Sequence, residues 1–276
     1  MKFNDVIKVH YQKLGLHLIN VLAQGTHYRV VRRNYGDNHR HQYDCYLHKD
    51  NDDSRPKIIF LYGGNWQSGS RGDYRFVADT LCNLGFDVFV PDYRLYPEAR
   101  FEQIIEDTSR AVNAIMTDIR KGPVFVMGHS SGAQLGALLT LNKTLLQSPE
   151  RIRGFIGLAG PYDFYPFTED SHWDLFAPAE KYPESQPVNF VTRDAPPLYL
   201  LHGETDKRVR RGHSKSLMEK QRQAGGRASR EVYENMGHVD IILSFSRIHR
   251  RKSQVVKDVN DFILENADEH SAEVIR

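Results

Sequence analysis

After residue 57 the sequence alternates short apolar runs with amphipathic segments, and this alternation restricts the fold more than any other feature. Strand–helix alternation predicts an α/β fold with a mostly parallel sheet and helices on both of its faces. The apolar runs expected as strands are Lys57–Tyr62, Phe86–Pro91, Val124–Gly128, Gly154–Ala159, Leu198–His202 and Arg230–Tyr233. The segments expected as helices are Tyr74–Leu84, Glu102–Arg120, Ala133–Leu146, His213–Gln223 and Val255–Leu264.

The chain before this alternation has a different character. Tyr28–Arg32 and Gln42–Leu47 flank a turn-rich stretch, which predicts an antiparallel pair of strands at one edge of the sheet. Apolar residues recur at steps of three or four over residues 3–24 and predict an amphipathic N-terminal helix. We expect this helix to dock on the main body. A flap near a substrate entrance or a lipid-contacting surface is the alternative.

Composition limits the class of protein. The 276 residues carry a formal net charge of +2, which argues against a nucleic-acid partner. Nothing resembles an interdomain linker, so we expect one domain over residues 1–276. No apolar run reaches the length of a membrane span and no signal peptide is apparent, so we expect no stable membrane insertion and a cytoplasmic location. The two cysteines, Cys45 and Cys82, exclude a disulfide framework and are expected to be packing residues.

The strongest local motif is Gly128-His129-Ser130-Ser131-Gly132, which fits the G-x-S-x-G nucleophile elbow. A sharp strand-to-helix turn strains the serine backbone, and the flanking positions must have almost no side chain. A buried-strand run precedes the motif and a helical pattern follows it, as this turn requires. The context predicts Ser130 as a nucleophile.

A serine hydroxyl needs a base, and the base needs an acid that orients it. His238 follows the last predicted strand, where a loop returns to the top of the sheet, and is the predicted base. Asp206 lies in the loop after Leu198–His202 and is the predicted acid, with Glu204 of the same loop as the alternative. The competing interpretation is that Asp206 only caps the helix near His213.

Donors for a developing oxyanion are expected after the first strand of the alternation. The consecutive glycines Gly63 and Gly64, followed by Asn65, allow backbone N–H groups to turn into the site. The N–H of Ser131, the residue after the nucleophile, is the second expected donor. The alternative is an ordinary Gly-Gly turn.

Residues 161–197 form a long irregular connection rich in aromatic side chains, which is typical of a lid or binding loop. We predict substrate contacts at Trp66, His129, Tyr162 and Phe164. His39, His41, Cys45 and His48 match no familiar ligand spacing, so no metal is expected.

Several motifs in register resemble one family. They are Tyr62–Trp66, Pro91–Glu98, Gly128–Gly132, the segment from His202 to Asp206 with Val209, and Gly237-His238. Together they resemble serine carboxylesterases of the α/β-hydrolase superfamily. The branch is similar to hormone-sensitive-lipase-like esterases, bacterial feruloyl-esterase-like proteins and arylformamidases. The family usually has a histidine where this chain has Tyr62.

The resemblance implies Ser130 as nucleophile, His238 as base and Asp206 as acid. It also implies oxyanion donors at Gly64, Asn65 and Ser131, with Gly63 shaping the loop. The expected function is hydrolysis of small or aryl carboxylic esters through an acyl-serine intermediate, without a cofactor. An arylformamidase that cleaves N-formylkynurenine and a non-catalytic binding protein are the alternatives. A homodimer through an edge strand or the N-terminal helix is a further expectation.

Overall fold

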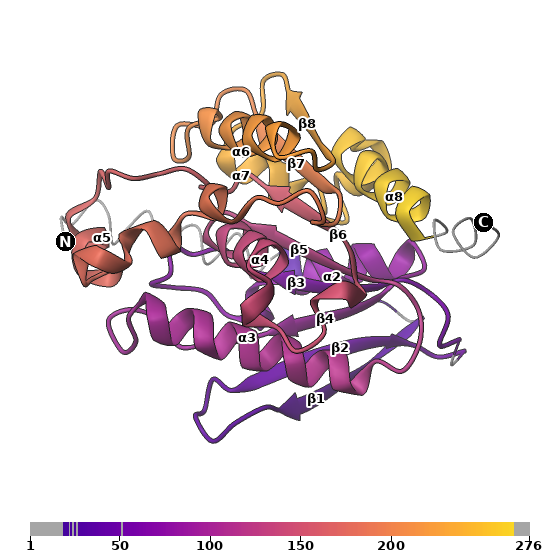
Figure 1. Cartoon of the computed structure of the whole chain (residues 1–276). Helices are drawn as coiled ribbons and strands as arrows, with labels where there is room; N and C mark the ends of the chain where they lie inside the picture. The colour runs from indigo at the N-terminus through magenta and orange to yellow at the C-terminus, as the bar shows by residue number, and fades with distance from the viewer. Residues whose placement is uncertain (1–18, 22, 24, 26, 51, 268–276) are drawn as a thin grey trace, which may run out of the picture.

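The computed structural model describes residues 19–21, 23, 25, 27–50 and 52–267. Within that part of the chain, eight strands form one sheet in the order β1-β2-β4-β3-β5-β6-β7-β8 (Figure 1). Neighbours from β4 to β8 are parallel, whereas β1 and β2 join the edge in antiparallel pairs. The strands are β1 (Tyr28–Asn34), β2 (Gln42–His48), β3 (Lys57–Leu61), β4 (Asp87–Pro91), β5 (Val124–His129), β6 (Ile152–Leu158), β7 (Leu198–Gly203) and β8 (Ala228–Tyr233).

Helices cover both faces of the sheet. The Cβ direction of Gly154 in β6 points at the ring of Phe262 in α8, while the next side chain, Phe155, meets Gly136 of α4. Because successive residues of a strand face opposite sides, α4 and α8 lie on opposite faces. The α-helices are α2 (Arg75–Asn83), α3 (Phe101–Asp118), α4 (Ser131–Leu141), α5 (Asp170–Leu175), α6 (Gly212–Gln223), α7 (His238–Leu243) and α8 (Gln254–Ala267).

The predicted fold class, including the antiparallel edge strands, is confirmed, and the predicted elements begin and end within a few residues of the observed ones. The largest difference is in Ala133–Leu146, where α4 ends at Leu141. The side chain of Asn142 accepts a hydrogen bond from the backbone N–H of Thr144 at 3.2 Å and starts a separate 3₁₀ turn. An asparagine that bonds its local backbone competes with the helix in this way.

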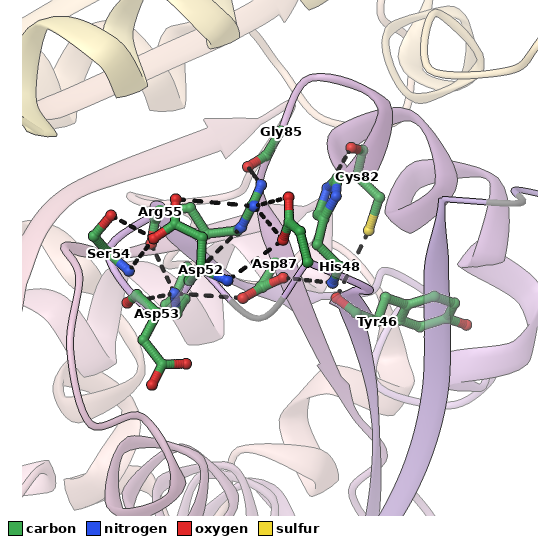
Figure 2. A network of polar contacts seen from close by, with 11 residues as sticks. Tyr46, His48, Asp52, Asp53, Ser54, Arg55, Cys82, Gly85 and Asp87 are labelled. Atoms are coloured by element: carbon green, nitrogen blue, oxygen red, sulfur yellow. Dashed lines mark hydrogen bonds and ion pairs between the residues drawn. The ribbon is translucent and has the colours of Figure 1, made fainter.

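Figure 2 shows a polar network at the amino ends of β3 and β4. The guanidinium of Arg55 donates to the carbonyl of Gly85 at 3.0 Å. Lys57 Nζ lies 3.4 Å from a carboxylate oxygen of Asp87, whose other oxygen accepts from the backbone N–H of His48 at 2.9 Å. The network fixes these strands at the edge opposite their carboxyl ends, where the predicted site residues follow.

Most of the predicted N-terminal helix over residues 3–24 lies outside the described residues. Residues 19–21 are helical, and the side chain of Asn20 bonds the carbonyl of Asp73 and the N–H of Phe76 at 2.7 and 3.0 Å. This end of the segment therefore lies against the start of α2. Among the described residues, no helix is long and apolar enough to cross a bilayer. Cys45 and Cys82 are both buried as free thiols, as expected of packing residues.

Candidate active site

Ser130 occupies the turn between β5 and α4 with φ 54° and ψ −125°, a strained backbone for a residue with a side chain. The turn is tight on both sides. A Cβ on Gly128 would lie 2.4 Å from the carbonyl oxygen of Gly132, and one on Gly132 would lie 2.2 Å from the carbonyl oxygen of Leu61. Any side chain at either position would clash with the backbone, so the motif requires both glycines. The turn that they allow places the serine at the carboxyl edge of the sheet.

The three residues predicted as nucleophile, base and acid meet at this edge. His238 Nε2 lies 2.9 Å from Ser130 Oγ, and His238 Nδ1 lies 2.8 Å from Asp206 Oδ2. Because a carboxylate only accepts, Nδ1 carries the proton and Nε2 is left to accept from the serine hydroxyl. Ser130 follows β5, Asp206 follows β7 and His238 follows β8. The carboxyl ends of these three strands lie on one side of the parallel sheet.

Asp206 is held by four donors. Its Oδ1 accepts from the backbone N–H groups of Arg208 and Val209 at 2.8 and 2.9 Å. Its Oδ2 lies 3.2 Å from Nε2 of the fully buried His202 as well as beside His238. Burial favours the neutral acid, but the hydrogen bonds from His202 and His238 outweigh it and keep the pKa of Asp206 far below its usual value.

Glu204, the alternative acid, is exposed, and its carboxylate accepts a long 3.4 Å bond from the N–H of Asn235. The geometry therefore favours Asp206 as the partner of His238. The contact of His202 with Asp206 is not predicted from the sequence, because the pattern around His202 indicates only the end of a strand.

The loop after β3 has the predicted backbone turn but uses its amides differently. Gly64 N–H, an expected oxyanion donor, instead donates to the hydroxyl of Ser131 at 3.0 Å. Asn65 and Trp66 both have positive φ, 56° and 57°. Within the part of the chain that the structure describes, the backbone N–H groups of Asn65 and Ser131 have no partner. These two are the free donors beside Ser130. Gly63 accepts from Tyr74 at its carbonyl, 3.2 Å away.

Tyr62, which stands where the resembling family has histidine, braces this loop through its hydroxyl. The hydroxyl accepts from Arg40 Nη2 at 2.9 Å, and the same nitrogen donates to the carbonyl of Gly69 at 2.7 Å. The Tyr62 ring stacks on Tyr93 at 4.8 Å, and the Tyr93 hydroxyl bonds the carbonyl of Tyr62 at 2.7 Å. Arg40 and Tyr93 therefore hold Tyr62, and with it the loop, in place.

The Asn65 side chain ties the loop to α5, which Figure 1 shows apart from the helices that cover the sheet. Asn65 Nδ2 donates to Glu169 at 3.0 Å, and His172 Nε2 donates to Asn65 Oδ1 at 3.0 Å. Burial lowers the pKa of His172, so it is neutral at pH 7. Trp66 is anchored beside it, with its indole N–H donating to Gln134 at 3.0 Å. We call Asn65, Glu169 and His172 the loop clamp.

A pocket opens over Ser130 and Ser131. Of the four predicted substrate contacts, Trp66 and Phe164 line it, and their rings stack at 5.7 Å. The other lining residues are Asn65, Pro161, Thr168, Glu169, His172, Arg208, Val209 and His213.

His129 and Tyr162 do not line this pocket, so the structure does not support their predicted substrate contacts. Tyr162 is fully buried and lies against Phe155 and Gly157 in the core. His129 is buried behind His238, where its Nε2 donates to the His238 carbonyl at 3.2 Å. Both side chains are buried in contacts with other parts of the fold, which their positions in the sequence do not reveal.

Within the described residues, no group of three or more histidine, cysteine or carboxylate side chains could hold a metal ion. His41, one of the histidines considered above, lies 3.1 Å from Asp107 in a buried pair. Its position is explained by that carboxylate.

His129 gives a testable pH dependence of stability. Burial and the neighbouring His238 lower its pKa to about 3. The unfolded chain therefore binds one more proton at this residue between pH 6.5 and 3, and stability falls as the pH falls through that range. Between pH 7 and pH 5 the free energy of unfolding should fall in both proteins. We expect the fall to be about 2 kcal/mol smaller in His129→Gln than in the unmodified chain. Urea unfolding at both pH values measures this. Exposed His39→Gln is the control, and equal losses in the unmodified chain and His129→Gln contradict the prediction.

A serine on a strand-to-helix turn, with its histidine and carboxylate following later strands of the same parallel sheet, defines an α/β-hydrolase. The family comparison agrees with this class. The chain belongs to the BD-FAE family, whose model matches residues 43–221.

Several proteins of known description are similar to this chain. The isoprenylcysteine alpha-carbonyl methylesterase of Arabidopsis thaliana is 24% identical over 78% of this chain and 58% of its own length. Esterase LipC of Mycobacterium tuberculosis is 28% identical over 84% and 69%. Kynurenine formamidase of Salmo salar is 27% identical over 60% and 56%. The chain thus spans little more than half of the first of these relatives.

Solved structures agree on the fold. The Pyrobaculum calidifontis esterase superposes with a TM-score of 0.76 at 17% identity, covering 97% of this chain and 94% of that one. A truncated carbohydrate esterase from gut microbiota gives a TM-score of 0.72 at 21% identity, covering 88% and 98%.

Proposed function

We propose that the chain hydrolyses small or aryl carboxylic esters through an acyl-serine intermediate. The observation that carries the proposal is the continuous contact from Asp206 through His238 to Ser130, at 2.8 and 2.9 Å, on the floor of a pocket. The names of the similar methylesterase and esterase support an ester as the bond that is cleaved.

In the proposed reaction, Ser130 Oγ attacks the ester carbonyl while His238 Nε2 takes its proton. The charge that develops on the carbonyl oxygen is stabilised by the free N–H groups of Asn65 and Ser131. His238 then protonates the leaving alcohol and later activates a water that releases the acid. Asp206 keeps the histidine tautomer and stabilises the imidazolium. These steps use only residues of the chain.

The pocket walls favour modest apolar or aryl groups. Trp66 and Phe164 present stacked rings to the space above Ser130, and such faces bind flat apolar groups well. Phe164 belongs to segment 161–197, which we propose acts as a lid or binding insertion. An acyl-length series of 4-nitrophenyl esters tests the proposal, with the highest kcat/KM expected for short chains. Absence of turnover across the series contradicts it.

The second candidate function is cleavage of the formamide N-formylkynurenine. The similarity to a kynurenine formamidase over 60% of this chain favours it, together with the aromatic pocket wall. Attack by the same serine on a formyl carbonyl would cleave the formamide bond, as its attack on an ester carbonyl would cleave the ester. Comparing kcat/KM on N-formylkynurenine and on phenyl acetate separates the two, and negligible formamide cleavage excludes this candidate. A non-catalytic binding role predicts turnover of neither.

The loop clamp predicts a positioning effect of His172. His172→Ala removes the donor that fixes the Asn65 side chain, and we expect kcat to fall about tenfold because the Asn65 N–H loses its orientation. KM should change little. His172→Gln, which can donate from its amide, should recover part of kcat. Gln67→Ala is the control, since it removes only an exposed 3.2 Å bond to Ser171. A rise in KM with unchanged kcat contradicts the prediction.

A further inference from the structure

We propose that the substrates of this pocket carry an anionic group, a carboxylate or a phosphate, and that Arg208 binds it. The inference rests on the proposed ester hydrolysis and specifies its substrate class. Arg208 lines the same pocket as Ser130, so this residue borders the space where an ester would react.

The backbone of Arg208 is fixed to the reaction centre. Its N–H donates to Asp206 at 2.8 Å, as does the N–H of Val209 at 2.9 Å. The carbonyl of Val209 accepts from the buried His202 at 2.9 Å. These bonds hold the start of the Arg208 side chain at one place relative to the reacting serine, while the side chain itself stays exposed.

The guanidinium of Arg208 forms no ion pair with a carboxylate in the described part of the chain. Arg208 and Glu169 are the arginine and the carboxylate among the lining residues, and burial lowers the pKa of the two lining histidines, His172 and His213. Glu169 accepts from Asn65 and lies 3.5 Å from His172, and it makes no ion pair with Arg208 within the described residues. Among residues 19–267 as described, the guanidinium of Arg208 makes no ion pair or hydrogen bond.

Some other arginines of the chain are paired with carboxylates. Arg94 makes two 2.7 Å bonds to Asp107, and Arg250 bonds Asp79 at 2.6 Å. Arg208 differs from them in lining the pocket that holds Ser130 while its guanidinium is free to bind a ligand. Its planar donor fork suits carboxylate and phosphate oxygens in particular.

The neighbours of Arg208 strengthen the local positive field. Lys207, Arg210 and Arg211 are exposed and, within the described part of the chain, have no carboxylate partner. A cluster of like charges at the mouth of a pocket attracts an anionic ligand and speeds its approach. We assign the contact itself to Arg208, because it alone of these four lines the pocket.

The experiment compares esters that differ by one charge. The first set shares an acetyl group and places the anion on the leaving group: 4-acetoxybenzoate, 4-acetoxyphenyl phosphate and neutral methyl 4-acetoxybenzoate. The second set places it on the acyl group: the mono-4-nitrophenyl ester of adipate and its methyl ester. For each set, kcat/KM for the anionic ester is divided by kcat/KM for the neutral ester. This ratio is then divided by the ratio of the non-enzymatic hydrolysis rates of the same two esters at the same pH, which gives the corrected ratio. The two anions of the first set distinguish a carboxylate from a phosphate.

We expect the corrected ratio to exceed about ten in at least one set, the size of a typical charged hydrogen bond. Arg208→Gln should bring that ratio close to one, and Arg208→Lys should retain part of it. Arg210→Gln, a matched change of an exposed arginine outside the pocket lining, removes only a contribution to the field and should lower the ratio much less than Arg208→Gln does. Melting temperatures confirm that each variant is folded.

Three results overturn the inference while leaving the ester hydrolysis intact. They are a corrected ratio near one in every set, a ratio that Arg208→Gln does not change, and an equal loss in Arg210→Gln. The last would indicate a diffuse basic surface, such as one that meets an anionic membrane. Failure of every ester, together with no labelling of Ser130 by a fluorophosphonate, overturns the proposed function itself and this inference with it.

Discussion

Ser130→Ala is expected to lower kcat on 4-nitrophenyl acetate by about 10⁴- to 10⁶-fold. The alanine lacks the hydroxyl that lies 2.9 Å from His238, so no acyl-serine can form. Loss of this one atom leaves the strained turn and its two glycine contacts in place. The fold should therefore survive, and the melting temperature should change by only a few degrees.

The control for Ser130→Ala is Ser54→Ala, an exposed serine in the loop ahead of β3. It should retain the full rate. Steady-state kinetics on both variants gives the comparison. Turnover by folded Ser130→Ala within tenfold of the unmodified chain contradicts the proposed nucleophile.

Asp206→Asn is expected to lower kcat by about 10⁴-fold with little change in KM. The amide can present an N–H where the carboxylate accepts from His238 at 2.8 Å, which favours the wrong tautomer of the histidine. His202, 3.2 Å from the same oxygen, would lose its contact with the carboxylate and keep its 2.9 Å bond to the carbonyl of Val209. The expected result is a folded protein whose serine lacks an effective base.

Glu204→Gln is the matched control for Asp206→Asn, because the two acids share one loop and both were candidates. Glu204 is exposed and makes a single 3.4 Å bond to Asn235, so this variant should keep most of its activity. Steady-state kinetics on the two variants compares the acids directly. A larger loss in Glu204→Gln than in Asp206→Asn would reverse the assignment of the acid.

The sequence was sufficient for the parts of the structure that follow from local patterns. Buried parallel strands are continuous apolar runs, and their alternation with helices predicted the parallel part of the sheet. Two short runs on either side of a turn-rich stretch predicted its antiparallel edge. The tight turn at Ser130 could be predicted because its two glycines lie at a fixed spacing. His238 and Asp206 could be placed because residues that follow parallel strands gather at one edge.

Contacts between residues distant in sequence could not be predicted. Asn65 meets His172 across 107 positions, and nothing local to either residue indicates the clamp. The bond from Arg40 to the Tyr62 hydroxyl is of the same kind. Tyr162 was assigned to the substrate because it starts an aromatic segment, yet its ring lies in the core. The direction of a side chain out of an irregular loop depends on packing, which composition does not encode.

The central claim is that Ser130 is an activated nucleophile, and a fluorophosphonate probe with peptide mapping tests it most directly. We expect a single adduct on the peptide that contains Ser130, fast labelling in the unmodified chain, and much slower labelling in Asp206→Asn. Denatured protein and Ser130→Ala should show none. Folded protein that leaves Ser130 unlabelled, or that carries the adduct on another residue, would contradict the account.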